Sequence, residues 1–239
     1  MAGHSKWANI KHKKAKEDAK RGQSFTKLIR EITVAARNWG GDVDASPRLR
    51  QLVEKGKAIN MPLDNITRAI KKGTGELPGV QYEALTYEGS GPGGLAIMIE
   101  ILTDNNNRTV GEMRHLFSKY HGTLGASGAV AWMFDHLGVI RTAAPAKVTE
   151  DQLLEALMEY DVQDISIEED LLTVTTSKTA LNEVREALIK INIPVEHAEL
   201  EWVAKNPIDV AEDKEEAVHK LLEKLEEQDD VQNLFTNLS

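Results

Sequence analysis

The chain has 239 residues, of which 41% are hydrophobic and 28% are charged, a composition typical of a folded, water-soluble protein. It contains no cysteine, which excludes disulfide bonds, thiolate metal sites and a cysteine nucleophile. The apolar run at 95–102 is too short to cross a bilayer and contains Glu100. No signal-peptide pattern is present at the start of the sequence, so we expect a cytoplasmic protein without a membrane segment.

The net charge of −9 is unevenly distributed along the chain. Residues 1–76 contain 17 Lys and Arg against 8 Asp and Glu, whereas residues 77–239 contain 12 against 30. Such a division predicts a module that binds a polyanion, joined to a body that repels one. Attraction between the two oppositely charged parts is the alternative explanation.

The first amphipathic helix is predicted over residues 24–39. Its apolar face contains Phe25, Leu28, Ile29, Ile32, Ala36 and Trp39. Three cations, Lys27, Arg30 and Arg37, fall on the opposite face. The glycines that follow residue 39 end this helix.

Two more helices complete a small helical domain. The second begins with Ser46 as N-cap and Pro47 at the first helical position. The third covers residues 61–73 and is expected to bury Leu63, Ile66 and Ile70. The glycine-containing stretch that follows is a linker to the rest of the chain.

Beyond residue 82 the sequence predicts strands and helices together. Residues 82–89 and 95–102 form a hairpin around a glycine-rich turn, a helix follows over 107–120, and 128–134 is expected to be a strand. The next segments follow the order β-α-β-β-α-β, which is a ferredoxin-like unit. Its first helix carries a capping box formed by Thr149 and Gln152.

The C-terminal segment contains one helix and one strand and cannot bury its own apolar face. The segment at 80–135 lacks one helix and one strand, so we expect the two to complete each other around the inserted unit. The predicted fold is α+β: an N-terminal three-helix domain followed by two ferredoxin-like α/β domains, the second split around the third. The expected domains are 1–76, 80–135 with 204–239, and 136–203.

The opening stretch combines cations with planar rings. Its candidate nucleic-acid-binding residues are Lys6, Trp7, Lys11, His12, Lys13, Lys14, Lys16, Lys20 and Arg21, to which we add Lys27, Arg30 and Arg37 of the first helix. Lysine and arginine bind phosphates and release counterions, while aromatic rings stack on unpaired bases. We expect the opening stretch to fold on its partner, with a merely solvated basic face as the alternative.

A second interpretation of the same stretch involves metal. If Met1 is removed, the free amine, two deprotonated amides and the imidazole of His4 form a square-planar site for Cu(II) or Ni(II). Any chain with a histidine in third position has this property. We therefore favour nucleic acid as the partner and expect no metal or other cofactor.

Two loops carry further polar signals. The glycine-rich 88–94 lacks the lysine and the following helix of a phosphate-binding loop, so a hairpin turn is the preferred interpretation. At 103–109, a strand is followed by a helix that needs only one cap. The additional polar residues there predict a second recognition surface made of Asp104, Asn105, Asn106, Asn107 and Arg108.

The sequence offers no catalytic constellation. Glu100 and Asp104 share a face of one strand but lie about 13 Å apart, too far for one metal ion. No pair of histidines falls at i and i+4 on a helix, and no serine occupies a nucleophile elbow. We therefore expect a binding protein rather than an enzyme.

Four segments resemble the YebC/PmpR family. They are residues 1–32, the turn at 87–94, the segment 103–115 and the segment 128–134. The resemblance runs from residue 2 to near the C-terminus. Two positions depart from the family's usual pattern: Asn106, where arginine is more common, and Ala129, where serine is usual. The missing arginine weakens the case for phosphate contacts at 103–109.

The resemblance implies a non-enzymatic cytoplasmic regulator of gene expression with three domains, the second split around the third. Members are described as transcriptional regulators that bind promoter DNA, whereas others, including a mitochondrial translational activator, act on messenger RNA or the ribosome. A flexible basic segment with aromatic residues suits irregular RNA. We expect a nucleic-acid-binding regulator that is a monomer, with DNA and RNA both open as targets and a protein–protein adaptor as a third class.

Overall fold

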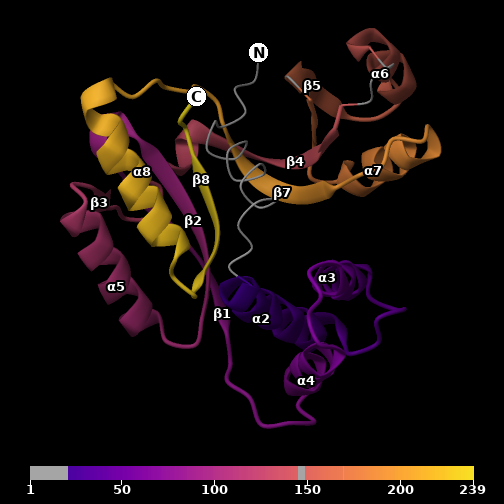
Figure 1. The fold of residues 1–239 in the computed structure, drawn as a ribbon, viewed down its shortest axis with the longest axis horizontal. Coiled ribbons are helices and arrows are strands. Elements are labelled where there is room, and N and C mark those ends of the chain that lie inside the picture. The colour runs from indigo at the N-terminus through magenta and orange to yellow at the C-terminus, as the bar shows by residue number, and fades with distance from the viewer. Residues whose placement is uncertain (1–20, 145–148, 169) are drawn as a thin grey trace.

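The structure, a computed structural model, describes residues 21–144, 149–168 and 170–239. Figure 1 shows a helical domain made of the first helices and two four-stranded sheets, each with helices on one face. The fold is α+β, as the sequence predicts. No helix within the described ranges is long and apolar enough to cross a membrane.

The helical domain consists of α2 (Arg21–Trp39), α3 (Pro47–Ala58) and α4 (Leu63–Gly73). Ser46 caps α3, because its side-chain oxygen accepts a hydrogen bond from the backbone N–H of Leu49 at 3.3 Å. The largest fully buried side chains of this core are Ile32, Leu49, Leu52 and Ile66. All three predicted helices are therefore present.

Two residues expected in this core are exposed instead. Trp39 is the last residue of α2 and is 59% exposed, and Leu63 is the first residue of α4 and also faces solvent. Both lie at helix ends, beyond the turns where α2, α3 and α4 pack against one another. Helical spacing indicates a face of the helix but not how far along it the neighbouring helices reach.

The first sheet has the order β3-β1-β2-β8. Its strands are β1 (Glu83–Ser90), β2 (Ala96–Thr103), β3 (Thr123–Leu124) and β8 (Val231–Thr236). The turn between β1 and β2 contains a short 3₁₀ helix, η1 (Pro92–Gly94), as expected for a hairpin. Two helices, α5 (Asn106–Lys119) and α8 (Glu212–Glu226), cover one face of this sheet.

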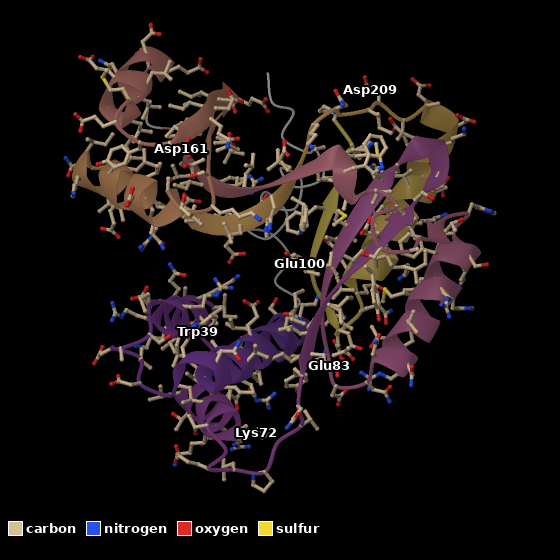
Figure 2. All side chains as sticks on the ribbon, turned by 180° about the vertical axis from the view of Figure 1, so that it is seen from behind. Trp39, Lys72, Glu83, Glu100, Asp161 and Asp209 are labelled. Carbon is tan, nitrogen blue, oxygen red and sulfur yellow. The ribbon has the colours of Figure 1, made fainter. Side chains whose placement is uncertain are left out.

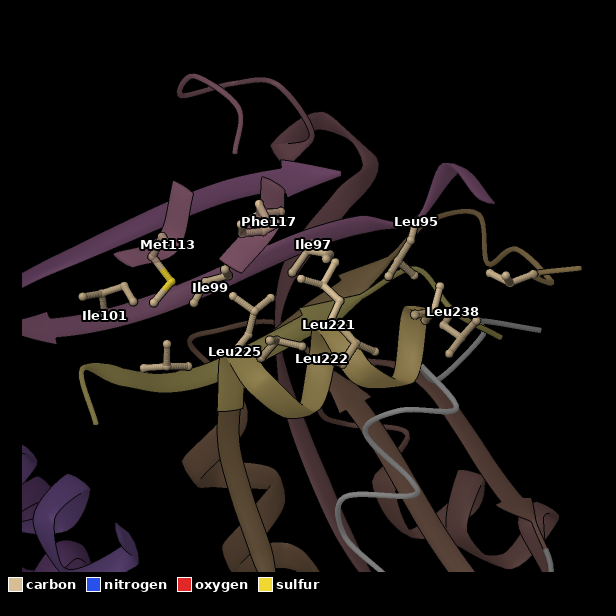
Figure 3. Close-up of a cluster of buried hydrophobic side chains, with 14 residues drawn as sticks. Leu95, Ile97, Ile99, Ile101, Met113, Phe117, Leu221, Leu222, Leu225 and Leu238 are labelled. Carbon is tan, nitrogen blue, oxygen red and sulfur yellow. The ribbon is translucent and has the colours of Figure 1, made fainter. Parts of the chain in front are cut away.

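Figure 3 shows how these two helices share one core with β2. Ile97, Ile99 and Ile101 project from alternate positions of β2 toward the helices. They meet a leucine cluster from α8 and two side chains from α5, namely Leu221, Leu222, Leu225, Met113 and Phe117. The C-terminal helix is therefore as much a part of this domain as the helix that follows β2.

The edge of the first sheet is completed by the end of the chain. β8 pairs antiparallel with β2, and Met98 lies opposite Phe235 in the register. The segment between β3 and α8 forms the second sheet before the chain returns. The expected insertion of one α/β unit into another is thus visible in the strand pairing.

The second sheet has the order β5-β6-β4-β7, with every neighbouring pair antiparallel. Its elements are β4 (Phe134–Ala143), α6 (Glu150–Leu157), β5 (Val162–Glu168), β6 (Leu171–Thr176), α7 (Leu181–Lys190) and β7 (His197–Ala204). This is the predicted ferredoxin-like order. The capping box is also present, with reciprocal bonds between Thr149 and Gln152 of 3.0 and 3.3 Å.

The predicted strand at 128–134 is wrong. Its place is taken by a loop and a 3₁₀ helix, η2 (Ala131–Met133), and β4 begins only at Phe134. The backbone N–H groups of Gly128, Val130 and Ala131 donate to the Glu88 side chain, so they are not available to a strand ladder. Because β4 begins at Phe134, it also crosses the expected domain boundary at 135.

Two glycines in helices provide a matched test of this packing. A Cβ at Gly73 would lie 2.4 Å from the carbonyl oxygen of Thr33 in α2, whereas a Cβ at Gly111 in α5 would meet nothing within 4 Å. We expect Gly73→Ala to lower the free energy of unfolding by about 1–3 kcal/mol, because α2 and α4 must separate. Gly111→Ala should raise it by about 1 kcal/mol, because alanine favours the helix. Urea denaturation of both variants measures the difference, and equal effects would contradict this close contact.

Candidate nucleic-acid interface

Most of the predicted nucleic-acid-binding residues lie outside the described part of the chain. This holds for Lys6, Trp7, Lys11, His12, Lys13, Lys14, Lys16 and Lys20, and for the side chain of Arg21. Their assignment stays a prediction from the sequence. The three remaining cations of the predicted set, in α2, are described together with their contacts.

The α2 cations contact the body of the protein rather than forming an open face. Lys27 Nζ donates to the carbonyl oxygen of Glu226 at 2.7 Å. Arg37 donates to the carbonyl oxygen of Val80 at 3.1 Å, in the segment that leads to β1. Arg30 is only 13% exposed along its side chain. Arg30 is therefore a structural residue of the domain junction.

Arg30 binds three groups on the first sheet. Its guanidinium lies 2.5 Å from the Asp230 carboxylate, and it donates to the carbonyl oxygens of Leu102 and Asp229 at 3.0 and 2.8 Å. It also lies over the ring of Tyr82, 5.6 Å from the centroid. A cation that the sequence placed on an open helix face thus fastens the helical domain to the sheet.

Asp230 receives a second cation from the polar stretch at 103–109. Arg108 lies 2.9 Å from the Asp230 carboxylate, and the hydroxyl of Thr109 donates to the same carboxylate at 2.6 Å. Thr103 adds a longer contact of 3.2 Å. We call Arg30, Thr103, Arg108, Thr109 and Asp230 the junction cluster. It joins α2, the β2–α5 turn and the residue that precedes β8.

The remaining residues of the polar stretch have local partners. Asn105 is the N-cap of α5 and accepts from the backbone N–H of Arg108 at 3.1 Å. Asp104 pairs with Arg108 at 2.9 Å, and Asn106 is hydrogen-bonded to the hydroxyl of Tyr87. Asn107 is exposed. The stretch therefore builds a helix start and contributes to the junction cluster, and all five residues from 104 to 108 are nevertheless exposed.

The junction cluster determines the charge of Asp230. Burial raises the pKa of its carboxyl, but hydrogen bonds from Thr109, Arg108 and Arg30 outweigh burial, so the pKa lies below its ordinary value of 3.8. Asp230 is thus ionised at neutral pH and holds two arginines together. A buried aspartate in a helix-to-strand turn has no signature in a single sequence, which is why Asp230 was not predicted.

Other cations of the helical domain do face solvent. Lys57, Arg68, Lys71 and Lys72 are exposed on α3 and α4. The C-terminal ends of α2 and α4 adjoin, because a Cβ at Gly41 would lie 2.8 Å from the side chain of Thr74. Figure 2 shows Trp39 and Lys72 on this domain. These residues add cations and an exposed ring to the basic part of the chain, and none of them is among the binding residues predicted from the sequence.

The helical domain also meets the second sheet through an ion pair. Lys55 of α3 lies 3.0 Å from Glu199 of β7, and Arg48 lies 3.1 Å from Glu31. Burial raises the pKa of Glu199, but Lys55, His197 and Arg48 lower it to about 2. The charges that act on Glu31 are those of Lys55, Glu199, Arg48 and Glu100, so three acids and two cations gather where the helical domain approaches both sheets. Figure 2 shows Glu100 near the centre of the molecule.

A cavity of about 270 Å³ lies between the helical domain and the first sheet. Its polar lining includes Glu31, Arg48, Thr86, Glu100 and Gln232. Burial raises the pKa of both Glu31 and Glu100. Among the described residues, no three histidine, aspartate or glutamate side chains are grouped so that they could hold a metal ion.

Asp230→Asn tests the junction cluster. We expect the variant to lose about 3 kcal/mol of unfolding free energy at pH 7, because two arginines lose their shared carboxylate. The folded pKa is lowered, so the contribution of Asp230 is complete above its ordinary pKa of 3.8 and is lost as the pH falls through the lower folded value. The difference from the unaltered protein should therefore shrink in acid. Asp229→Asn is the control, since Asp229 is exposed and contributes its backbone carbonyl to Arg30.

Comparison with known proteins covers nearly the whole chain. The model of the TACO1/YebC protein N-terminal domain matches residues 5–76, and that of the TACO1/YebC second and third domain matches residues 82–238. A probable transcriptional regulatory protein of Thermoanaerobacter pseudethanolicus is 48% identical over 238 residues, covering 100% of this chain and 97% of the relative. One of Geobacter sulfurreducens is 50% identical over 237 residues, covering 99% and 95%.

A solved structure has the same fold. The crystal structure of a conserved hypothetical protein from Aquifex aeolicus superposes with a TM-score of 0.82 at 44% sequence identity, covering 93% of this chain and 91% of that one. The two chains are thus similar both in sequence and in overall fold. This chain belongs to the TACO1/YebC family.

Proposed function

We propose that this chain is a regulator of gene expression that binds nucleic acid through its N-terminal domain and catalyses no reaction. The charge division carries the proposal: residues 1–76 hold 17 cations against 8 acids, and the rest of the chain holds 12 against 30. A polyanion is attracted to the first part and repelled by the second. The body thereby directs nucleic acid to the basic domain.

Transcription is the first candidate process. Relatives about half identical to this chain are named probable transcriptional regulatory proteins. The outer face of α4 is exposed and presents Thr67, Arg68 and Lys71. These residue types contact phosphates and base edges in the major groove of DNA. We infer that α4 faces DNA if the target is a duplex.

Translation is the second candidate process, and the position of α2 favours it. α2 packs on one side against α3 and α4 and on another against the first sheet through Arg30, so this longest helix of the domain cannot enter a groove. Binding would then rely on the seven cations and Trp7 of residues 1–21. A short basic segment with an aromatic ring suits the irregular surface of RNA.

We further propose a cytoplasmic monomer. Many proteins that read DNA are two-fold symmetric dimers that place helices in successive grooves. Here a single basic domain would make the contacts instead. Light scattering at micromolar concentration checks the oligomeric state. A mass of twice 26.5 kDa would contradict the monomer.

Replacing Lys11, Lys13 and Lys14 by alanine tests the basic segment. We expect nucleic-acid affinity to fall by tens of fold at low salt, because three phosphate contacts are lost. The slope of log K against log salt should fall by about 3, since each such contact contributes about 1. Fluorescence anisotropy over a salt series measures both quantities.

A charge-matched control separates local contacts from net charge. Alanine at Lys178, Lys190 and Lys220, all exposed on the acidic body, removes the same three positive charges. The control should bind almost as well as the unaltered protein. If both triple variants weaken binding equally, the segment has no special role. A protein–protein adaptor would show no salt-sensitive binding to any nucleic acid.

One comparison decides between the two processes. The protein is sedimented with ribosomes and, separately, titrated against duplex DNA at the same salt, about 0.15 M. Sedimentation with ribosomes that requires residues 1–21 makes it a translation factor. Sequence-dependent shifts of DNA without ribosome association make it a transcription regulator.

A further inference from the structure

The cavity between the helical domain and the first sheet holds more acid than base. Glu31 of α2 and Glu100 of β2 line it, and the charge of Glu199 in β7 acts on both of them. Two cations accompany these acids: Arg48 lies 3.1 Å from Glu31, and Lys55 lies 3.0 Å from Glu199. The third acid, Glu100, is the one that this group of side chains leaves without a cation.

Glu100 has an amide as its partner. The side-chain N–H of Asn233 donates to the Glu100 carboxylate at 2.9 Å, and no lysine or arginine of the described ranges forms an ion pair with it. Burial raises the pKa of the Glu100 carboxyl, and the charge of Glu199 acts in the same direction. A cation that entered the cavity would oppose both effects. The site is therefore one positive charge short.

A second polar side chain of the cavity has no partner. The amide nitrogen and the amide oxygen of Gln232 are both buried, and neither forms a hydrogen bond within the part of the chain that the structure describes. Buried polar groups in proteins are normally hydrogen-bonded, because leaving one unpaired costs free energy. An occupant of this cavity would therefore need both a donor and an acceptor to satisfy Gln232.

These requirements select a peptide that carries a lysine. An ammonium group is a compact cation with three N–H donors and can bind the Glu100 carboxylate. The backbone beside it offers an N–H to the Gln232 oxygen and a carbonyl oxygen to the Gln232 nitrogen. A bare metal ion provides no donor, and the excess of acid repels phosphates. The occupant that fits is a basic peptide.

The opening segment of this chain, residues 1–20, joins the described structure beside the cavity. It leads directly into Arg21, the first residue of α2. Gln23, in the first turn of α2, donates to the carbonyl oxygen of Glu227 at 3.1 Å. Glu227 lies in the turn between α8 and β8, and β8 is the strand that carries Gln232. The start of α2 and one wall of the cavity are therefore neighbours.

The opening segment is also long enough to reach the cavity. Arg21 and Glu31 lie ten residues apart in α2, which corresponds to about 15 Å along the helix axis. An extended chain spans about 3.3 Å per residue, so roughly five residues before Arg21 cover the same distance. Lys16 lies at that position, and three more lysines precede it closely: Lys11, Lys13 and Lys14. The covalent connection gives them an effective concentration of about millimolar at the cavity, which a separate basic protein lacks.

We propose that this cavity is the docking site of the opening segment, and that a lysine of the segment binds Glu100 when no nucleic acid is present. The attraction between the basic and the acidic parts of the chain then has a defined place. The inference rests on the proposed function, because the same lysines are assigned there to phosphates. It adds regulation to that function, since nucleic acid has to displace the segment from the cavity.

Crosslinking of the full-length protein tests the docking directly. A carbodiimide joins a lysine amine to a carboxylate where the two are in contact, and peptide mass spectrometry identifies the pair. Without nucleic acid, we expect crosslinks from the lysines at 11–16 to Glu100 or Glu31. The ion pair between Lys55 and Glu199, 3.0 Å apart, is the internal reference for the reaction. Whichever probe binds, single-stranded RNA or duplex DNA of about 16 nucleotides, should abolish the first crosslinks and leave the reference unchanged.

Glu100→Gln tests the competition. If the segment is docked about three-quarters of the time, the apparent affinity for nucleic acid is lowered about 4-fold, and Glu100→Gln should restore that factor at low salt. The variant should also reduce the crosslinks to Glu31. Glu183→Gln is the matched control, because it removes the same charge from an exposed position on α7. Its affinity should stay near that of the unaltered protein.

The outcomes separate the two proposals. If the unaltered protein binds neither probe, the proposed function fails, while the crosslinks still decide the docking. The docking is overturned if crosslinks from the segment spread evenly over exposed acids such as Glu183, join two copies of the chain, or persist when the probe is bound. An equal gain of affinity in both glutamine variants overturns it as well. Thermal unfolding is measured for both variants, and if Glu100→Gln is unstable, the crosslinks of the unaltered protein decide.

Discussion

The packing of the helical domain against the first sheet depends on the shared carboxylate of Asp230. Arg30 reaches it from the helical domain and Arg108 from the start of α5, so one buried acid joins segments that lie far apart in sequence. Each arginine alone would leave a charge poorly compensated at this junction. With both arginines bound to Asp230, the basic helical domain is fixed to the acidic body.

The contacts of the helical domain also show which of its cations are engaged within the protein. In α2, Arg30 binds the carbonyl oxygen of Leu102 in β2, and Lys27 binds the carbonyl oxygen of Glu226 at the end of α8. Both cations are therefore engaged in contacts within the protein. The cations Arg68, Lys71 and Lys72 of α4 are exposed instead.

Periodicity predicted the secondary structure well, and three-dimensional context determined the rest. The helices, the ferredoxin-like order and the return of the chain to β2 all follow from apolar spacing and from the need to cover apolar faces. The strand expected at 128–134 failed because a distant glutamate captured its N–H groups. Arg30 was misplaced for a similar reason, since its partner is 200 residues away.

The pairing of β8 with β2 has a consequence for synthesis on the ribosome. The first sheet cannot close until the last strand has emerged, although β1 and β2 are made much earlier. The inserted domain has its own complete set of strands and can fold before that point. Asp230 emerges just before β8, so the ion pairs that Arg30 and Arg108 make with its carboxylate form only at the end of synthesis. The basic N-terminal part of the chain is therefore synthesised before the first sheet of the acidic body can close.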